Sequence, residues 1–197
     1  MDETELIARS QQGDGTAFSQ LVRLYGDRIF NLSHHVCAGA PSEAEDIYQE
    51  TFVTAFKKIR QYQSRSHLGT WLYRIAANLC WMKLRRRKNE RTVPIVTSMP
   101  GEGPDEGVSE NILKDPKGDP AKRAHRKEVQ EVVTAALEAL PVDYRLAVVL
   151  KDMQGLSNEE IAKILNLSLP AVKSRLHRGR LLLRTRLNKY VHGGAHP

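Results

Sequence analysis

Apolar residues recur at steps of three and four along most of this chain, which is the spacing of amphipathic helices. In the first half the spacing predicts helices over about residues 18–32, 43–60 and 69–88. In the second half it predicts helices over about residues 129–140 and 146–153, with two further helices after them. Runs of alternating β-branched residues joined by hairpin turns, which indicate strands, are almost absent from the sequence. The pattern therefore predicts an all-α protein.

The second and third of these helices carry further sequence signals. Gly39 and Pro41 indicate a turn, after which Ser42 and Glu45 match a capping box and predict the start of a helix. We expect the long third helix to bury one apolar stripe, made of Leu72, Ile75, Ala76, Leu79 and Met82.

The last two predicted helices are joined by a tight turn. Ser157 and Glu160 match a second capping box, and Asn166 can adopt the left-handed conformation that ends a helix. Ser168 can cap the next helix, with Pro170 in its first turn, where backbone amides lack helical partners. Such a pair is typical of a helix-turn-helix, whose second helix lies in the DNA major groove. An ordinary amphipathic helical hairpin is the alternative.

The helical spacing is interrupted once over a long segment. Pro, Gly and acidic residues dominate residues 92–121, a composition typical of a linker that is extended or disordered when free. We therefore expect two small helical domains, over residues 1–91 and 122–190, joined by an acidic flexible linker. A linker of this length leaves the relative placement of the two domains open.

Charge and composition narrow the class of protein. The formal net charge is +7 and the pI about 9.5, which favours a polyanionic partner. No stretch approaches the roughly 20 apolar residues of a membrane span, and the N-terminus lacks the apolar core of a secretory signal. Cys37 and Cys80 do not make a disulfide framework. We expect a reduced, cytoplasmic protein with no membrane insertion.

Signals for an enzyme or a metal site are weak. His34, His35 and Cys37 are close in sequence, but a helix turns His35 away from the other two. Two or three ligands also fall short of the four of a closed zinc site. The sequence has no Gly-rich phosphate loop, no nucleophile elbow and no H-E-x-x-H motif. We expect no catalytic residues, no metal and no cofactor.

Two helix faces in the first domain could bind a partner. Asp46, Gln49 and Glu50 share one side of a helix, since they are three and four residues apart. They form either a solvated face, which spacing alone favours, or a docking site for a basic partner. On the long helix an aromatic, arginine and amide face suits single-stranded nucleic acid, although Trp71 could instead belong to the core. That face consists of Trp71, Arg74, Asn78, Trp81 and Arg85.

The second helix of the helix-turn-helix is strongly basic. Its seven Lys and Arg residues come without one acidic residue, whereas a solvated helix usually mixes charges of both signs. Early positions of such a helix approach base edges and later ones approach the DNA backbone. The residues expected nearest to the bases are Lys173, Ser174, His177 and Arg178.

Taken together, these motifs resemble the extracytoplasmic-function, or group 4, sigma factors of bacterial RNA polymerase. AEDIYQETFVTAFKKI (44–59) is similar to the core-binding helix of that family, and TWLYRIAANL (70–79) to its promoter-melting helix. Residues 140–184, which contain the helix-turn-helix, are similar to its fourth conserved domain. The resemblance covers nearly the whole chain.

The resemblance implies partners and residue roles. It implies that core RNA polymerase binds this chain, with its largest-subunit clamp on Asp46, Gln49 and Glu50 and its flap as a second contact. It also implies promoter DNA as a partner, an anti-sigma factor as a regulator, and a linker that threads towards the RNA exit path. The −35 duplex would be read by Lys173, Ser174, Arg175, His177 and Arg178. The unpaired −10 strand would be read by Tyr62, Ser64, Arg65, His67, Arg74, Asn78, Trp81 and Arg85.

One position departs from the family pattern. The loop QYQSRSHLG has Leu68 where the commoner pattern has Phe, so the preferred −10 base is not fixed by the resemblance. Two other hypotheses remain at this point. The chain could be a stand-alone helix-turn-helix regulator, or an RNA-binding protein that uses the Trp and Arg face. A stand-alone regulator has no need of the acidic face of the helix over residues 43–60.

Overall fold

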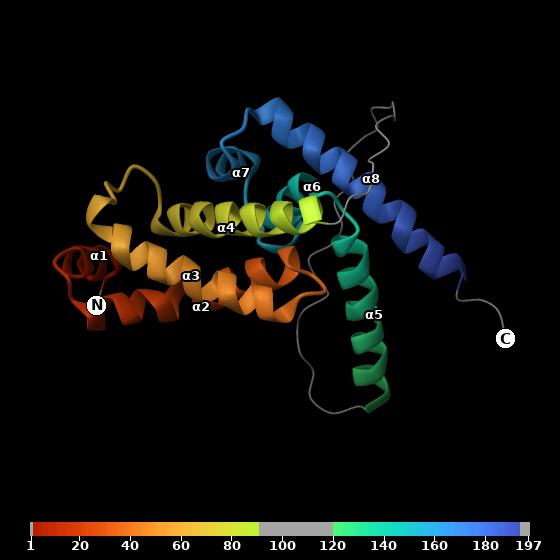
Figure 1. Ribbon diagram of the computed structural model, residues 1–197, viewed down its shortest axis with the longest axis horizontal. Coiled ribbons are helices and arrows are strands. Elements are labelled where there is room, and N and C mark those ends of the chain that lie inside the picture. The colour runs from red at the N-terminus through yellow and green to blue at the C-terminus, as the bar shows by residue number, and fades with distance from the viewer. Residues whose placement is uncertain (1, 91–119, 194–197) are drawn as a thin grey trace.

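The computed structural model describes residues 2–90 and 120–193, and every regular element in these ranges is a helix (Figure 1). The predicted all-α fold with two helical domains is confirmed. Nearly all of the predicted linker lies outside the described residues. Within them, none of the helices is long and apolar enough to cross a membrane.

The N-terminal domain contains four α-helices. They are α1 (Glu3–Gln11), α2 (Gly15–Val36), α3 (Pro41–Lys58) and α4 (Leu68–Glu90), with a short 3₁₀ turn at Ile59–Gln61. The three long helices pack side by side, and α1 lies against α2 (Figure 1). Most of the stability of helices in proteins comes from packing of their apolar faces, so burial of the shared apolar face holds the domain together. The largest side chains fully buried there are Leu21, Ile29, Leu32, Ile47, Ile59 and Leu68.

The helix starts in this domain differ from the predictions. α1 was not predicted, since its first turns are mostly polar. α3 begins at Pro41, and Ala40 caps it without a side-chain hydrogen bond, so the predicted capping box of Ser42 and Glu45 is wrong. Proline is favoured at the first helical position because it has no N–H and its φ is already helical. A side-chain cap is present instead at the start of α2, where the carboxylate of Asp14 accepts hydrogen bonds from the backbone amides of Thr16 and Ala17.

The buried stripe of α4 is shorter than predicted. Leu72, Ala76 and Leu79 are buried and Ile75 is half-buried, but Met82 is 47% exposed. Ten residues at about 100° each turn Met82 about 80° away from Leu72 around the helix. The apolar stripe therefore ends before Met82.

The C-terminal domain contains the predicted helix-turn-helix. Its elements are α5 (Pro120–Glu138), α6 (Val142–Val148) with a π-helical turn at Val149–Met153, α7 (Asn158–Leu165) and α8 (Leu169–Gly193). α8 packs on α5, α6 and α7 (Figure 1). The largest side chains fully buried in this domain are Leu137, Val149, Leu150, Ile161 and Ile164.

The predicted turn chemistry of the helix-turn-helix is confirmed. The Ser157 amide donates to Glu160 over 2.8 Å, and the Glu160 amide donates to the Ser157 hydroxyl over 3.1 Å. Asn166 has φ of 52° and ψ of 54°, the left-handed conformation that ends α7. The Ser168 hydroxyl accepts from the Ala171 amide at the start of α8. These contacts fix how the second helix leaves the first.

Candidate polymerase and nucleic-acid interfaces

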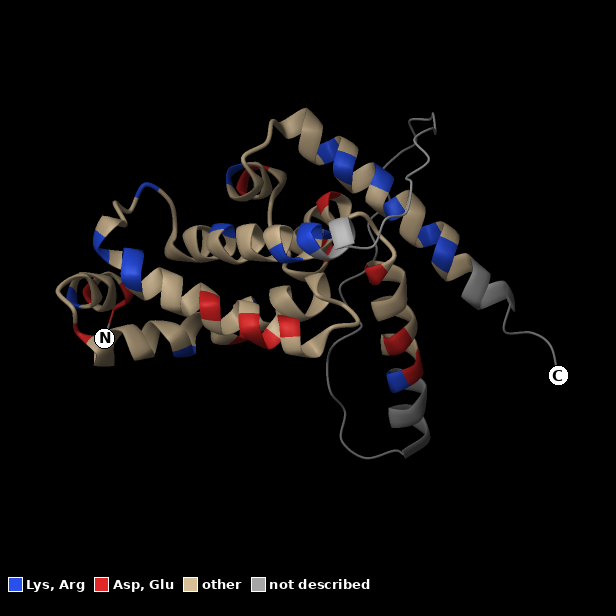
Figure 2. Cartoon of the chain, in the orientation of Figure 1, with Lys and Arg blue, Asp and Glu red and all other residues tan. Residues whose placement is uncertain are grey.

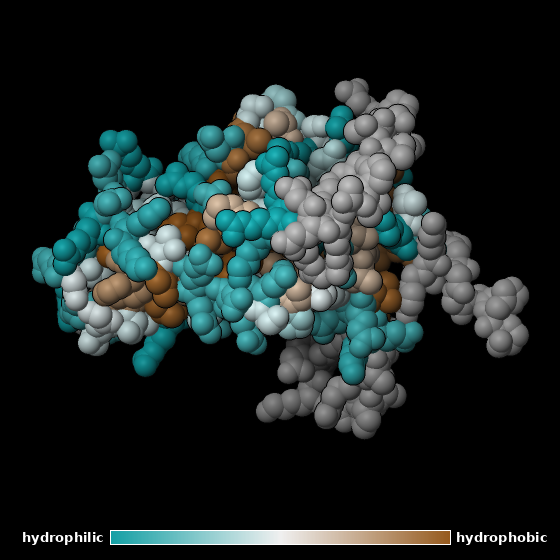
Figure 3. Space-filling model, viewed as in Figure 1, coloured by the Kyte–Doolittle hydropathy of each residue, from teal (hydrophilic) through white to brown (hydrophobic). Residues whose placement is uncertain are grey.

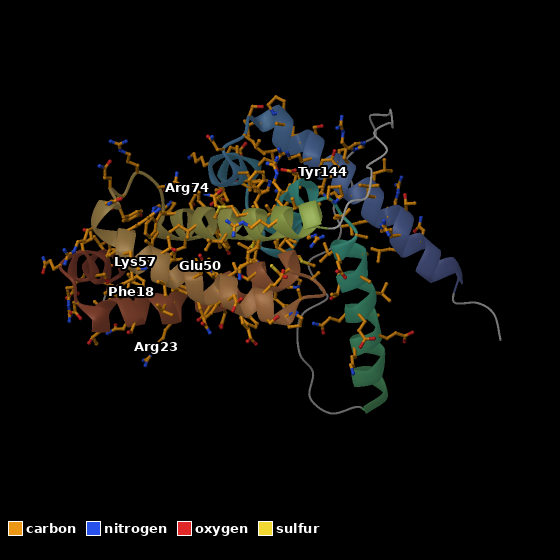
Figure 4. All side chains as sticks on the ribbon, viewed as in Figure 1. Phe18, Arg23, Glu50, Lys57, Arg74 and Tyr144 are labelled. Atoms are coloured by element: carbon orange, nitrogen blue, oxygen red, sulfur yellow. The ribbon has the colours of Figure 1, made fainter. Side chains whose placement is uncertain are left out.

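The acidic residues predicted to dock on polymerase lie on an open side of α3. Asp46, Gln49 and Glu50 are all exposed, and Figure 2 shows acidic residues along this helix. Figure 4 labels Glu50 on the same helix. The inner side of α3 carries Ala44, Ile47 and its other buried residues. The helix therefore divides into a core side and an acidic outer side, as the spacing predicts.

The same side of α3 carries apolar residues that sequence reasoning missed. Val53 is 51% exposed and Phe56 is 44% exposed, although both are large hydrophobic residues. Figure 3 shows apolar atoms at the surface in the part of the view where α3 lies. Val53 is three residues from Glu50, so it continues the same face. The signal in the sequence was two apolar residues outside the period of the buried stripe.

We refer to Asp46, Gln49, Glu50, Val53 and Phe56 as the docking face. It combines two carboxylates with two exposed apolar side chains, a composition that suits contact with another protein. Asp46 is also linked to α4, since its carboxylate accepts from the Lys83 ammonium over 3.0 Å. The docking face is therefore connected to the helix that carries the predicted −10 residues.

The predicted −10 loop, residues 62–69, is held by a buried tyrosine. Tyr62 is 8% exposed and its hydroxyl donates to the carbonyl of Ser66 over 2.5 Å. Its ring lies 5.3 Å from the ring of Trp71, and burial raises the pKa of its hydroxyl. The side-chain amide of Gln11, on α1, donates to the backbone carbonyl of Tyr62 over 2.8 Å. Tyr62 therefore shapes the loop, and the exposed members of the predicted set can make the contacts.

Four of the predicted −10 residues, Tyr62, Ser64, Arg65 and His67, come together around one cleft at this loop. Ser64, Arg65 and His67 all line one cleft between the loop and α1, and Ser64 adopts a positive φ of 53°. The cleft has a volume of about 580 Å³, which is in the range of small-ligand pockets. Lys163 of the C-terminal domain lines it as well. The other residues that line it are Glu3, Thr4, Ile7, Ala8, Gln11, Tyr62, Ser66 and Leu68.

The predicted −10 residues of α4 do not form one uniform exposed face. Arg74 and Asn78 are exposed, and Figure 4 shows Arg74 on α4. Trp81 is half-buried against the core, and the Arg85 guanidinium lies 4.7 Å from the centre of its ring. A cation over an aromatic ring stabilises both side chains in place. Arg74 and Asn78 are thus the accessible pair, whereas one side of Trp81 is occupied.

The predicted −35 residues lie in the first half of α8. Lys173, Ser174 and Arg178 are exposed, and basic residues follow α8 along its length (Figure 2). His177 is half-buried. Arg175 is half-buried and pairs with Asp143 of α6 over 3.1 Å. Fewer of the Lys and Arg side chains of α8 are therefore accessible than its sequence indicates.

A second basic residue of α8 also has a structural role. The Arg180 guanidinium makes two hydrogen bonds to the Asp152 carboxylate, of 3.1 and 2.6 Å. This pair fixes α8 to the π-helical turn. The partners of Arg175 and Arg180 lie on other elements, about 30 residues earlier, so inspection of α8 alone could not reveal them.

The cysteines and histidines take part in no cluster of metal ligands among the residues that the structure describes. No group of three His, Cys, Asp or Glu side chains there could hold a metal ion. Cys37 and Cys80 are buried free thiols in the N-terminal domain. A hydrogen bond to Cys37 and burial raise the pKa of the Cys80 thiol well above its ordinary value. A thiol that is buried and has a raised pKa is a poorer nucleophile than an exposed one.

Both halves of the chain match families of known domains. Residues 21–90 match the family described as Sigma-70 region 2, and residues 130–183 match Sigma-70, region 4. The first match spans the docking face, the −10 loop and α4. The second spans most of the C-terminal domain, including the helix-turn-helix.

Curated relatives align over most of the chain. The ECF RNA polymerase sigma factor SigE of Mycolicibacterium smegmatis is 36% identical over 93% of this chain, which spans 66% of that relative. SigW of Bacillus subtilis is 34% identical over 92% of this chain and 94% of its own length. The ECF RNA polymerase sigma-E factor of Escherichia coli is 31% identical over 89% of this chain and 88% of its own length.

Two solved structures share the fold. CnrH, in complex with the cytosolic domain of CnrY, aligns with a TM-score of 0.63 and 23% identity over 93% of this chain and 95% of its own. RpoE of Bartonella quintana, in complex with the anti-sigma factor NepR, aligns with a TM-score of 0.61 and 22% identity over 87% of this chain and 96% of its own. Because both Sigma-70 regions match in order and relatives aligned over most of their length exceed 30% identity, the chain belongs to the extracytoplasmic-function sigma factors of the sigma-70 family.

Proposed function

We propose that this chain binds core RNA polymerase through the docking face and directs initiation by reading two promoter elements. The recognition helix α8 holds the −35 duplex, with Lys173, Ser174, His177 and Arg178 nearest to the bases. The −10 loop and the exposed face of α4 hold the opened −10 strand. Membership of the family supports these roles, and so does the exposure of Lys173, Ser174 and Arg178 on α8 and of Arg74 and Asn78 on α4.

One observation carries the proposal more than any other. A single chain presents an acidic and apolar docking face, a cleft beside a basic loop, and a basic helix-turn-helix on a separate domain. A regulator that binds only duplex DNA needs the last of these and has no use for the first two. The stand-alone regulator is therefore not favoured, and the match of residues 21–90 to Sigma-70 region 2 agrees.

Strand opening needs no covalent chemistry by this chain, so we infer that it is not an enzyme. A protein that binds the opened strand more tightly than the duplex shifts the equilibrium towards the opened state by that difference in affinity. Unstacking one base costs a few kcal/mol. Contacts to a single-stranded base contribute about 1–3 kcal/mol each, and phosphate contacts add to them. The cleft beside Ser64, Arg65 and His67 is the place for such a base.

We also infer an anti-sigma factor as a regulatory partner and the cytoplasm as the location. RpoE of Bartonella quintana, which shares this fold, is bound to the anti-sigma factor NepR in its solved structure. A promoter-binding protein acts where the chromosome lies, which in bacteria is the cytoplasm.

Assembly with core RNA polymerase tests the proposal directly. Purified chain is mixed with core enzyme and separated by size exclusion, and we expect both to elute together. A variant with Asp46→Lys and Glu50→Lys should elute separately while keeping its helical circular dichroism. The matched control is Glu5→Lys, which reverses one exposed carboxylate on α1. Elution of the wild-type chain apart from core enzyme would contradict the proposal.

A further inference from the structure

Two thiols inside the N-terminal domain contact each other, although residues 38–79 separate them in the sequence. Cys37 caps the C-terminal end of α2, and Cys80 lies in the middle of α4, which packs against α2. Both side chains are buried, at 1% and 0% exposure, and both are free thiols. The Cys80 thiol donates a hydrogen bond to the sulfur of Cys37. The fold therefore brings the two cysteines of the sequence to one place.

Neither thiol belongs to the docking face, the −10 loop or the recognition helix. A single buried Cys behaves as a small hydrophobic residue, and core packing is enough to explain it. Two thiols that meet from different helices are also the reactants of a disulfide. Oxidation can join them without bringing distant parts of the folded chain together.

The two thiols differ in reactivity. The hydrogen bond from Cys80 lowers the pKa of Cys37, and the charges of Arg145 and Lys83 act in the same direction. Burial and the Glu43 carboxylate oppose this shift without reversing it. The same hydrogen bond, together with burial, raises the pKa of Cys80 well above its ordinary value. Because the thiolate is the nucleophile in thiol oxidation, we expect Cys37 to react first.

The position of Cys37 at a helix end gives a small oxidant a route to it. Cys37 is followed by Ala38 and by the exposed Gly39, whose positive φ of 79° belongs to the turn into α3. Helix ends open locally more readily than helix centres, because their last carbonyls lack helical partners. Cys80, in contrast, lies in the middle of α4. Local opening therefore exposes Cys37 to an oxidant before Cys80.

We propose that Cys37 and Cys80 are a modification site at which a hydroperoxide forms an intramolecular disulfide. The Cys37 thiolate attacks one oxygen of the hydroperoxide, the O–O bond breaks, and uptake of one proton gives a sulfenic acid and an alcohol, or water from hydrogen peroxide. The Cys80 sulfur then attacks the sulfenic sulfur, the S–O bond breaks, and the hydroxyl leaves as water with the thiol proton of Cys80. The two thiols lose two electrons, which the hydroperoxide gains.

The disulfide closes residues 37–80 into one covalent loop. That loop contains the whole docking face, the −10 loop and the exposed pair Arg74 and Asn78. A cross-link stabilises a fold mainly by restricting the unfolded chain, and more so when the loop is longer. Oxidation therefore keeps these surfaces folded under conditions that unfold the reduced chain. In a reducing compartment the disulfide is transient, because cellular thiols reverse it.

The test uses the free chain without polymerase, so its outcome is independent of the proposed function. Reduced protein is treated with hydrogen peroxide and denatured, and the remaining thiols are blocked with iodoacetamide. Intact mass and a peptide map then report the state of each cysteine, and thermal melting is measured before and after dithiothreitol. Cys37→Ser and Cys80→Ser are matched variants, since each leaves one thiol and cannot form the disulfide.

We expect the oxidised wild-type protein to lose two hydrogens, to bind no iodoacetamide and to yield linked peptides from a monomer. Its melting temperature should rise by about 5–15 °C and return to the reduced value with dithiothreitol. Neither serine variant should show this rise. The Cys37 thiol in Cys80→Ser should be oxidised faster than the Cys80 thiol in Cys37→Ser.

Results on the wild-type protein alone can overturn the proposal, whether or not the serine variants fold. It is overturned if both thiols still react with iodoacetamide, or if oxygen is added to one thiol without linked peptides. It is also overturned if the only disulfide joins two copies of the chain, or if the linked protein melts no higher than the reduced one. Faster oxidation of Cys80 than of Cys37 in the variants would overturn the order of the two steps.

Discussion

Single residues in this chain often have roles that their type alone does not reveal. Tyr62 was predicted to contact DNA; it is buried, it shapes the loop that carries Ser64, Arg65 and His67, and it lines the cleft beside them. Arg180 belongs to a basic run that indicates a phosphate partner, yet it pairs with Asp152. The sequence predicted which types of residue gather in each segment. It could not show which of these side chains form contacts within the protein, because the residues that they contact lie on other elements.

Gly179 gives a prediction at this scale, since a helix glycine is usually improved by alanine. Here a Cβ would lie 2.6 Å from Cγ2 of Val148 and 3.4 Å from Tyr144, where α8 crosses α6. We expect Gly179→Ala to lower the free energy of unfolding by about 1–3 kcal/mol through overpacking. Gly15→Ala is the control, since a Cβ there meets nothing within 4 Å. Urea unfolding of both variants checks this, and a more stable Gly179→Ala protein would contradict the close packing.

Arg178 gives a second prediction at this scale, about how binding depends on the −35 sequence of the promoter. It is exposed in the first half of α8, with a long 3.5 Å contact to the Tyr144 hydroxyl. If it pairs with a base edge, Arg178→Ala should cost holoenzyme about 1–3 kcal/mol of binding on its preferred −35 sequence. On sequences altered at that base the loss should be small. Arg184→Ala, farther along α8, should weaken all sequences alike, as a phosphate contact does. An equal loss for Arg178→Ala on every −35 sequence would assign it to the backbone.

At the scale of elements, the local sequence predicted both ends of α7 correctly. The capping box of Ser157 and Glu160 and the left-handed Asn166 were predicted from sequence and are present. The same motif at Ser42 and Glu45 failed, because Pro41 one residue earlier is a better first helical residue. The polar helix α1 was missed because periodicity detects a helix only through its apolar face. Short polar helices depend on tertiary packing, which a local pattern does not contain.

The capping box of α7 makes stability depend on pH in a defined direction. A hydrogen bond from the Ser157 amide, with other contacts, lowers the pKa of Glu160 below its ordinary 4.5. Because the folded pKa is below the unfolded one, the contribution is complete above about pH 5 and is lost as pH falls through the folded pKa. Glu160→Gln keeps the capping geometry without the charge. Its melting temperature should fall below that of wild type at pH 7, and the difference should shrink as the pH is lowered to about 3.

The control for this prediction is Glu159→Gln, which removes an exposed carboxylate from the same helical turn. It should change the melting temperature less at pH 7, since Glu159 is not part of the capping box. A difference between Glu160→Gln and wild type that stays constant across this acidic range would show that the charge of Glu160 does not stabilise α7.

The docking face gives a prediction for the apolar part of α3. Val53 and Phe56 are both exposed, and the ring of Phe56 lies against that of Phe18. Val53→Ser should weaken the affinity for core polymerase by about tenfold, since burial of a large apolar side chain contributes about 1.5–3 kcal/mol. The stability of the free protein should fall only slightly, because about half of this side chain is already in water. Leu24→Ser on α2, 57% exposed, is the matched control. Unchanged affinity for Val53→Ser would exclude Val53 from the docking face.

At the scale of the whole molecule, the sequence predicted two helical domains and the order of their motifs. It could not predict how the domains meet, because a long linker permits many placements. In the structure, hydrogen bonds of Arg145 and Tyr73 join residues that are 109 and 81 positions apart, beside the cleft that Lys163 helps to line. These two contacts, between residues far apart in the sequence, are what place the C-terminal domain on the N-terminal one.

Run-off transcription with purified core RNA polymerase on a promoter library tests the central claim most directly. Core enzyme alone should initiate on none of the library's promoters, and addition of this chain should produce transcripts from a subset that shares one −35 and one −10 sequence. Arg178→Ala should change the −35 preference of that subset, and Ser64→Ala with His67→Ala should change the −10 preference. If the chain associates with core enzyme but no template yields a transcript, the account of promoter reading is wrong.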